Sequence, residues 1–112
     1  MAETITRDEL RQAIESAEVL VLDALGGEYY SKQHLPGALP LPPPEVDARA
    51  SELLPDRDAA IVTYCSNRSC PNSSQVADRL TALGYRNVRA YHDGIQDWVE
   101  AGLPTESLGL GQ

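Results

Sequence analysis

Short apolar segments alternate with segments of helical periodicity along this chain of 112 residues. Apolar runs of strand length fall at residues 18–22, 38–41, 59–64 and 88–91. Apolar residues at helical spacing fall at residues 7–16, 45–54, 75–83 and 94–101. The continuous runs are typical of strands covered on both faces. The alternation therefore predicts an α/β fold with a mainly parallel sheet.

Local signals mark the ends of several segments. Thr6 and Glu9 have the spacing of a capping box, which predicts that Thr6 caps the first helix. Gly84 follows the third helical segment, where a glycine commonly ends a helix. Gly26 and Gly27 predict a loop between the first two strands.

Length and charge limit what the chain can bind. We expect one compact domain over residues 1–106 and a flexible tail over residues 107–112. The formal net charge is −8 at pH 7, so no basic patch is expected. This charge argues against nucleic acid and anionic membranes as partners and is compatible with a basic protein.

Hydropathy and cysteine content predict a cytoplasmic location. No apolar run approaches the ~20 residues of a membrane span, and the start, MAETITRDELRQ, has no hydrophobic signal region. Thiols are usually kept reduced in the cytoplasm. The two cysteines are therefore expected to serve chemistry rather than to form a structural bridge.

Both cysteines lie in one loop, within the segment AAIVTYCSNRSCPNSSQVADRL at residues 59–80. Ligands bind at the carboxyl ends of strands in such sheets, and Asp23 and Cys65 stand at two of these ends. Cys65 precedes a helix N-terminus, whose unpaired N–H groups and partial positive charge favour a thiolate. We expect Cys65 to be a nucleophile; the alternative is a small buried apolar residue.

The polar residues after Cys65 are expected to form an anion-binding loop. The candidates are Ser66, Asn67, Arg68, Ser69, Asn72 and Ser73. Arg68 would add positive charge, and Asn72 and Ser73 are good caps for the following helix.

Cys70 has two interpretations, and neither is favoured. It could resolve a persulfide or a sulfenate on Cys65 by forming a disulfide, or it could face the base of the helix without a role. His34 and His92 would complete a set of four zinc ligands, but the spacing matches no familiar zinc arrangement. We expect neither a metal nor a cofactor.

Taken together, these motifs resemble the rhodanese family of single-domain sulfurtransferases over nearly the whole chain. VLVLD followed by HLPGALPLP is similar to the first signature of the family, and IVTYC to the strand that carries its catalytic cysteine. ADRLTALGYRNVRAYHDGIQDWVEAGLP is similar to its final segment. The resemblance implies a three-layer rhodanese-like fold, with a five-stranded mainly parallel sheet flanked by helices.

The resemblance also implies a chemistry. Cys65 takes the place of the nucleophile that accepts sulfane sulfur as a persulfide and passes it to a thiol or to cyanide. Residues 66–71 take the place of the anion-binding loop. The implied partners are a small sulfane-sulfur donor and an acceptor, which is a thiol, cyanide or a protein.

Several positions depart from the family's pattern. Cys70 and Pro71 stand where the family has an arginine followed by a serine, and the loop is two residues longer. Leu25 stands in place of the arginine of the first signature. Asp93 replaces a glycine of the usual Gly-Gly step, and Gln33 replaces the usual glycine before the histidine.

Three functions therefore compete. The first is a sulfurtransferase that carries sulfur on Cys65. The second is a thiol redox protein, or an arsenate reductase-like protein, in which Cys65 and Cys70 cycle. The third is a non-catalytic rhodanese-like binding module with an unreactive Cys65.

Other polar and aromatic residues are expected to support the fold. Asp23 and His34 are expected to satisfy backbone groups more than to take part in catalysis. Tyr29 or Tyr30 is expected to pack with its hydroxyl paired, and Trp98 is expected in the core.

Overall fold

The computed structural model describes residues 3–107, and within them the strands form one five-stranded sheet. Its order is β1-β5-β4-β2-β3, and every strand pair is parallel, as the alternation predicts. The strands are β1 (Glu3–Thr4), β2 (Leu20–Asp23), β3 (Leu39–Pro40), β4 (Ile61–Tyr64) and β5 (Val88–Tyr91).

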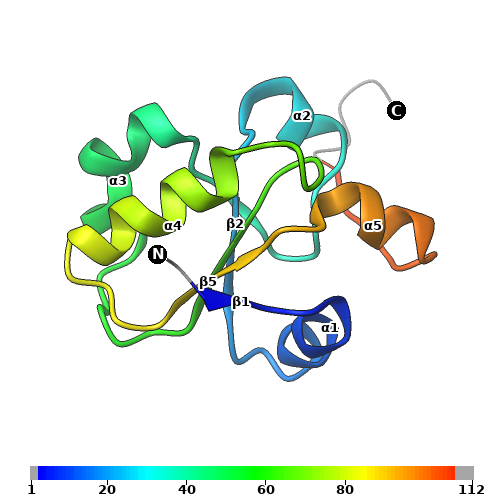
Figure 1. The fold of residues 1–112 in the computed structure, drawn as a ribbon, viewed down its shortest axis with the longest axis horizontal. Helices are drawn as coiled ribbons and strands as arrows, with labels where there is room; N and C mark the ends of the chain where they lie inside the picture. The colour runs from blue at the N-terminus through cyan, green and yellow to red at the C-terminus, as the bar shows by residue number, and fades with distance from the viewer. Residues whose placement is uncertain (1–2, 108–112) are drawn as a thin grey trace.

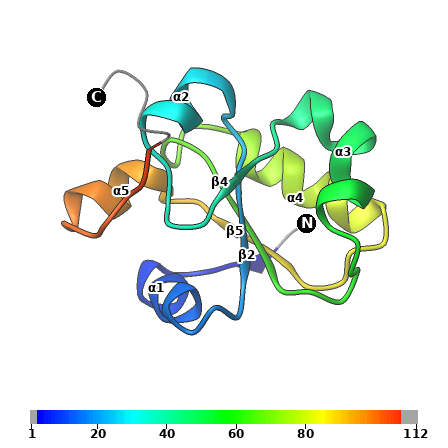
Figure 2. The ribbon, with the colours of Figure 1, turned by 180° about the vertical axis from the view of Figure 1, so that it is seen from behind.

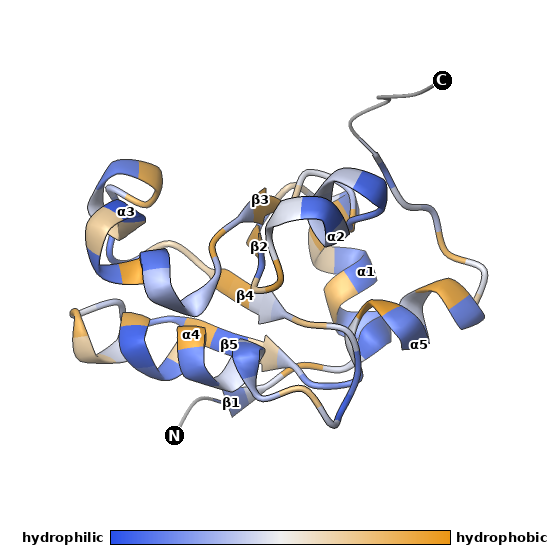
Figure 3. Cartoon of the chain, turned by 90° about the horizontal axis from the view of Figure 1, so that it is seen from above, coloured by the Kyte–Doolittle hydropathy of each residue, from blue (hydrophilic) through white to orange (hydrophobic). Residues whose placement is uncertain are grey.

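Helices cover both faces of this sheet. They are α1 (Arg7–Glu15), α2 (Gly27–Lys32), the 3-10 helix η1 (Pro43–Glu45), α3 (Val46–Leu53), α4 (Asn72–Ala82) and α5 (Gly94–Glu100). Figures 1 and 2 show α3 and α4 on one side of the strands and α1 and α5 on the other. Figure 3 shows the same layers from above, with β4 and β5 between the two groups of helices. The expected three-layer α/β fold is confirmed.

Each face of the sheet has its own apolar core. Leu22 and Leu80 belong to the core beneath α3 and α4, whereas Leu10 belongs to the core beneath α1 and α5. Ile61 and Val62 are consecutive in β4 and enter opposite cores, because side chains alternate across a strand. Full burial of one such side chain stabilises the fold by about 1.5–3 kcal/mol.

The predicted ends of several elements are confirmed. The Thr6 hydroxyl accepts a hydrogen bond from Glu9 N at 3.2 Å, and the Glu9 carboxylate accepts one from Thr6 N at 3.1 Å. The capping box is therefore complete. Gly84 follows α4 with φ +102°, a conformation that favours glycine. Trp98 is 1% exposed, as expected for a core residue.

Two short elements, α2 and β1, escaped sequence analysis. The loop predicted at Gly26 and Gly27 continues into α2, a six-residue helix with no buried residue, and β1 has only two residues. Short elements of this kind carry too little periodicity to be detected.

Helix α4 begins at Asn72 rather than at residue 75. Pro71 already has helical dihedral angles and occupies the N-cap position, so Asn72 and Ser73 are not the caps that we expected. The Asn72 amide instead donates to Ala24 O at 3.2 Å, and Ser73 is buried.

The C-terminal segment returns to the body of the domain. The backbone of Glu106 pairs with that of His34 in an isolated antiparallel bridge. The predicted flexible tail falls largely on residues 108–112, which lie outside the described residues.

Candidate active site

Cys65 follows the last residue of β4, one of the inner strands of the sheet. All four residues of β4 are buried, and Cys65 itself is 1% exposed. The neighbouring strand β2 ends at the same level as β4, since their last residues, Asp23 and Tyr64, are paired. The two strand ends that the sequence singled out, at Asp23 and Cys65, are therefore adjacent in space.

A disulfide joins Cys65 to Cys70, with 6.2 Å between the two Cα atoms. Residues 65–71, called the cysteine loop below, turn back on themselves to make this bond. Cys70 N donates to Asn67 O at 3.1 Å, and Ser69 N donates to the Asn67 side-chain oxygen at 3.0 Å. The two sulfurs are therefore within bonding reach of each other, and the resolving role of Cys70 stays a prediction.

Helix α5 holds the beginning of the cysteine loop. Ile95 N donates to Cys65 O at 2.9 Å, and Gln96 N donates to Ser66 O at 3.0 Å. The contact needs a glycine at position 94, because a Cβ there would lie 2.6 Å from the Ser66 carbonyl. The first turn of α5 and the start of the loop are thus packed backbone to backbone.

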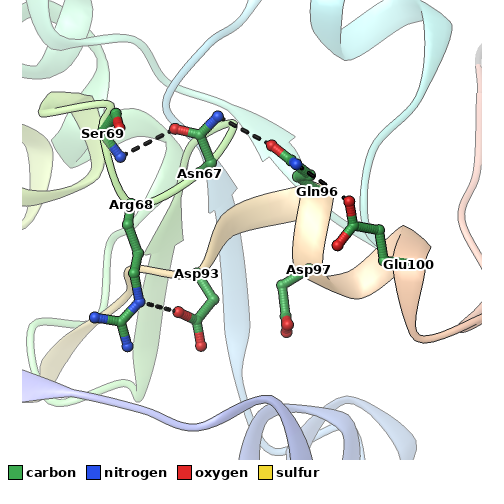
Figure 4. A pocket seen from close by; sticks show the side chains of 7 residues that line it. All are labelled: Asn67, Arg68, Ser69, Asp93, Gln96, Asp97 and Glu100. Atoms are coloured by element: carbon green, nitrogen blue, oxygen red, sulfur yellow. Dashed lines mark hydrogen bonds and ion pairs between the residues drawn. The ribbon is translucent and has the colours of Figure 1, made fainter.

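Side chains hold the tip of the loop to the same helix. The Asn67 amide donates to the Gln96 side-chain oxygen at 3.0 Å, and the Arg68 guanidinium forms an ion pair with Asp93. Figure 4 shows Asn67 between Ser69 and Gln96, with Arg68 directed to Asp93. Asp93 therefore compensates the positive charge of Arg68, which we expected to bind an anion. This ion pair lies at the surface, since the Arg68 side chain is 78% exposed.

A pocket of about 250 Å³ lies between the loop tip and α5. Its lining residues are Asn67, Arg68, Ser69, Asp93, Gln96, Asp97 and Glu100 (Figure 4). The acidic members have partners: Asp97 accepts from Arg7 and from the Tyr91 hydroxyl, and Glu100 accepts from Gln96.

Beneath the loop, Asp23 organises a buried polar network. Its carboxylate accepts hydrogen bonds from Leu25 N at 2.7 Å, Gly26 N at 3.2 Å and the Tyr64 hydroxyl at 2.8 Å. The Tyr64 oxygen in turn accepts from Leu35 N at 3.1 Å. Burial raises the pKa of Asp23 although these bonds oppose the rise, and burial also raises the pKa of Tyr64. Asp23 holds backbone groups, as expected.

The chain is similar in sequence to known proteins. Residues 6–101 match the model of the rhodanese-like domain family. The chain belongs to this family. It is 38% identical over 104 residues to an HTH-type transcriptional regulator of Mycobacterium tuberculosis, and the match covers 93% of this chain but 45% of the regulator. It is 34% identical over 105 residues to a sulfurtransferase of Allochromatium vinosum, covering 93% of this chain and 94% of that protein.

Solved structures agree on the architecture. A crystal structure of a protein from Bacillus halodurans superposes with a TM-score of 0.86 at 22% identity, covering 96% of this chain and 78% of that one. This likeness supports the fold alone.

His34 holds the rhodanese-like domain together near the strand ends. Its Nδ1 atom lies 2.6 Å from Tyr30 O, and its ring stacks on that of Tyr30 with 3.9 Å between centroids. The Tyr30 hydroxyl donates to Ala38 O at 2.6 Å, whereas Tyr29 is 68% exposed. His34 therefore makes a structural hydrogen bond, and Tyr30 is the one of the two tyrosines that packs with its hydroxyl paired.

Two further properties concern metals and membranes. Over residues 3–107, no group of three or more His, Cys, Asp or Glu side chains is arranged to hold a metal ion. In the same range, none of the helices is long and apolar enough to cross a membrane.

The structure brings Cys65, Cys70 and residues 66–69 together and adds a contributor that sequence analysis missed. Helix α5 supplies Gln96, which lies 29 residues from its partner Asn67. The sequence signal for this contact of α5 was the Asp93-Gly94 step. We compared that step with the family's pattern but did not infer from it that Gly94 packs against the backbone of Ser66. Asn72 and Ser73 lie at the start of α4 but do not cap it: the Asn72 amide donates to Ala24 O, and Ser73 is buried.

Proposed function

We propose that this rhodanese-like domain is a sulfurtransferase that carries sulfane sulfur on Cys65. The observation that carries the proposal is the position of Cys65: it directly follows the inner strand β4 and begins a loop that leads into α4. A relative named sulfurtransferase aligns over nearly its whole length, which supports the same chemistry here.

The proposed uptake step starts from reduced Cys65. Its thiolate attacks the outer sulfur of a donor such as thiosulfate, the sulfur–sulfur bond of the donor breaks, and sulfite leaves with the electron pair. The product is a persulfide on Cys65. A thiol or cyanide then attacks the outer sulfur and restores the Cys65 thiolate.

The structure suggests which groups stabilise the anionic sulfur. The Ser66 hydroxyl lies 3.9 Å from Cys65 Sγ, and α4 directs its N-terminal end at the loop. Arg68 is paired with Asp93, so we assign the anion-binding role mainly to backbone N–H groups of residues 66–68, 72 and 73. No cofactor is needed for this chemistry, and a reducing compartment such as the cytoplasm would keep both cysteines as thiols.

The test is a measurement of sulfur uptake by the reduced protein. The protein is reduced, freed of reductant and incubated with thiosulfate or, separately, with glutathione persulfide, and intact and peptide masses are recorded. We expect a Cys70→Ser chain to gain one sulfur atom on Cys65 and to lose it on addition of cyanide. A Cys65→Ser chain should gain none. If the Cys70→Ser chain gains no sulfur while Cys65 remains readily alkylated, the proposal is wrong.

The disulfide favours a second candidate, a thiol redox protein or oxyanion reductase in which the two cysteines cycle. This candidate predicts that arsenate or a mild peroxide oxidises the reduced protein to the disulfide without any gain of sulfur. A non-catalytic binding module instead predicts slow alkylation of Cys65 at neutral pH after reduction.

A further inference from the structure

We propose that Cys70 is a second catalytic cysteine that releases the sulfane sulfur held on Cys65 as hydrosulfide. The inference rests on the proposed function, because it requires a persulfide on Cys65. It assigns to the domain a further activity, the reductive release of sulfide, beyond transfer of sulfur to a thiol or to cyanide.

The disulfide shows which sulfur Cys70 can reach. Its Sγ atom is bonded directly to Cys65 Sγ, which is the inner sulfur of a Cys65 persulfide. The two cysteines are separated by five positions, so the loop between them must fold tightly to make this bond. Cys65 is 1% exposed, whereas Cys70 is only partly buried.

A hydrogen-bonded turn directs Cys70 back toward Cys65. The side chain of Asn67 accepts from Ser69 N, and its backbone oxygen accepts from Cys70 N. One residue thus bonds two of the three that follow it, which fixes the direction of the chain at Cys70. Turns of this kind are a known property of asparagine side chains.

Helix α5 keeps this turn in place. The amide of Asn67 donates to Gln96, and Arg68 pairs with Asp93, so two successive residues at the loop tip are tied to the start of α5 (Figure 4). The carbonyls of Cys65 and Ser66 are bonded to the same helix. The loop that carries both cysteines is therefore held by one helix. Holding the two reacting groups close together favours their reaction.

The step balances without an external oxidant. The Cys70 thiolate attacks Cys65 Sγ, a bond forms between the two Sγ atoms, and the bond between the inner and the outer sulfur breaks. The outer sulfur leaves with the electron pair and takes up a proton, the one that the Cys70 thiol gave up, as hydrosulfide. The sulfane sulfur is reduced by two electrons, and the two cysteine sulfurs are oxidised to the disulfide seen in the structure. A further round requires a dithiol reductant.

The experiment measures sulfide and protein mass in the absence of an acceptor. Reduced wild-type, Cys70→Ser and Cys65→Ser chains are freed of reductant and mixed with thiosulfate. Hydrosulfide is followed with a sulfide-selective electrode. We expect the wild type to release one hydrosulfide per chain and to end as the disulfide, lighter by two hydrogens. The Cys70→Ser chain should keep the added sulfur and release none.

The outcomes separate this inference from the proposed function. A wild type that keeps the persulfide on Cys65, or in which Cys70 attacks the outer sulfur, frees the Cys65 thiolate and ends as a persulfide on Cys70, would overturn the inference. A sulfur-loaded Cys70→Ser chain would still uphold the proposed function. A Cys70→Ser chain that folds, judged by circular dichroism, and takes up no sulfur overturns both. If that variant does not fold, Cys70→Ala replaces it in the same comparison.

A second variant tests the turn itself. Asn67→Ala removes the side-chain bonds to Ser69 N and Gln96 and leaves both cysteines. We expect release of hydrosulfide to slow by about tenfold relative to uptake of sulfur, because two hydrogen bonds of ordinary strength that hold the turn are lost. The matched control is Asn87→Ala, an exposed residue just before β5, at the opposite end of the sheet. Equal rates of release in the two variants would show that the turn does not position Cys70.

Discussion

The Tyr64 hydroxyl donates a 2.8 Å hydrogen bond to the Asp23 carboxylate, and both residues are 0% exposed. The bond joins the last residues of two neighbouring parallel strands, directly before the cysteine that begins the loop. Because Tyr64 also accepts from Leu35 N, one phenol ties β4, β2 and the turn after His34 into a single unit. The base of the candidate active site is therefore fixed by buried polar contacts.

Tyr64→Phe should destabilise the fold. The change leaves Asp23 without one donor and Leu35 N without its acceptor, and each orphaned buried group costs about 1–3 kcal/mol. Urea unfolding at neutral pH measures the loss in free energy of unfolding. Tyr29→Phe is the control. Tyr29 is 68% exposed, so loss of its hydroxyl should leave no buried group without a partner. A Tyr64→Phe chain as stable as the control would contradict this account of the network.

The stability of the fold should decrease as pH rises through the pKa of Asp23. Burial raises this pKa in the folded chain, so between the unfolded value of about 4 and the folded value the folded state binds more protons. The contribution of Asp23 to the free energy of unfolding is complete below its pKa in the unfolded chain. It is lost as pH rises through its pKa in the folded chain.

Asp23→Asn removes the titration and serves as the reference. Free energies of unfolding are measured for both chains between about pH 3 and pH 8. The difference, wild type minus variant, should decline with rising pH over the window above the ordinary pKa of an aspartate. A difference that is flat or increases over that window would show that burial is not the dominant influence on Asp23.

Gly94→Ala should damage the loop more than Gly102→Ala. Both glycines have a positive φ, +73° and +78°, so both substitutions carry the cost of a left-handed conformation, about 1–2 kcal/mol. Only at Gly94 would the added Cβ meet backbone, at 2.6 Å from the Ser66 carbonyl; at Gly102 nothing lies within 4 Å.

Thermal unfolding and the rate of Cys65 alkylation after reduction measure the two consequences. Gly94→Ala should have the lower melting temperature of the two variants and an altered alkylation rate. Gly102→Ala should keep the alkylation rate of the wild type. Identical behaviour of the two variants would show that the contact between α5 and the loop is not required.

Thr63→Val should weaken the joint between β4 and the start of α4. The buried Thr63 hydroxyl donates to Ser73 O at 2.8 Å, and its replacement by a methyl group of similar size should cost about 1 kcal/mol. Thr81→Val in α4 is the matched control, because the exposed Thr81 hydroxyl donates to Ala77 O at 2.9 Å and water can replace that bond. Urea unfolding should distinguish the two; equal losses would argue against a special role for the Thr63 bond.

Much of the architecture could be predicted from local sequence. The apolar run before Asp23 and that before Cys65 are buried strands, and Thr6 with Glu9 caps α1, because each of these features depends on residues close together in the chain. The weak elements, β1 and α2, carry too few residues for a periodic signal. Asn72 and Ser73 were wrongly expected to cap α4 for a local reason, since Pro71 occupies the N-cap position without any side-chain hydrogen bond.

The sequence by itself determined the alternation of the longer strands and helices, the parallel sheet, and the placement of Asp23 and Cys65 at strand ends. Hydrophobic periodicity and strand alternation are properties of short segments. Only the tertiary structure decided what surrounds Cys65. The bond between Cys65 and Cys70 depends on how the loop turns between them. The support of the loop by Gln96 and the backbone contact at Gly94 depend on how α5 returns across the sheet to the loop after β4. Such contacts join residues far apart in the chain, and their geometry is set by the packing of whole elements rather than by the preferences of the residues that make them.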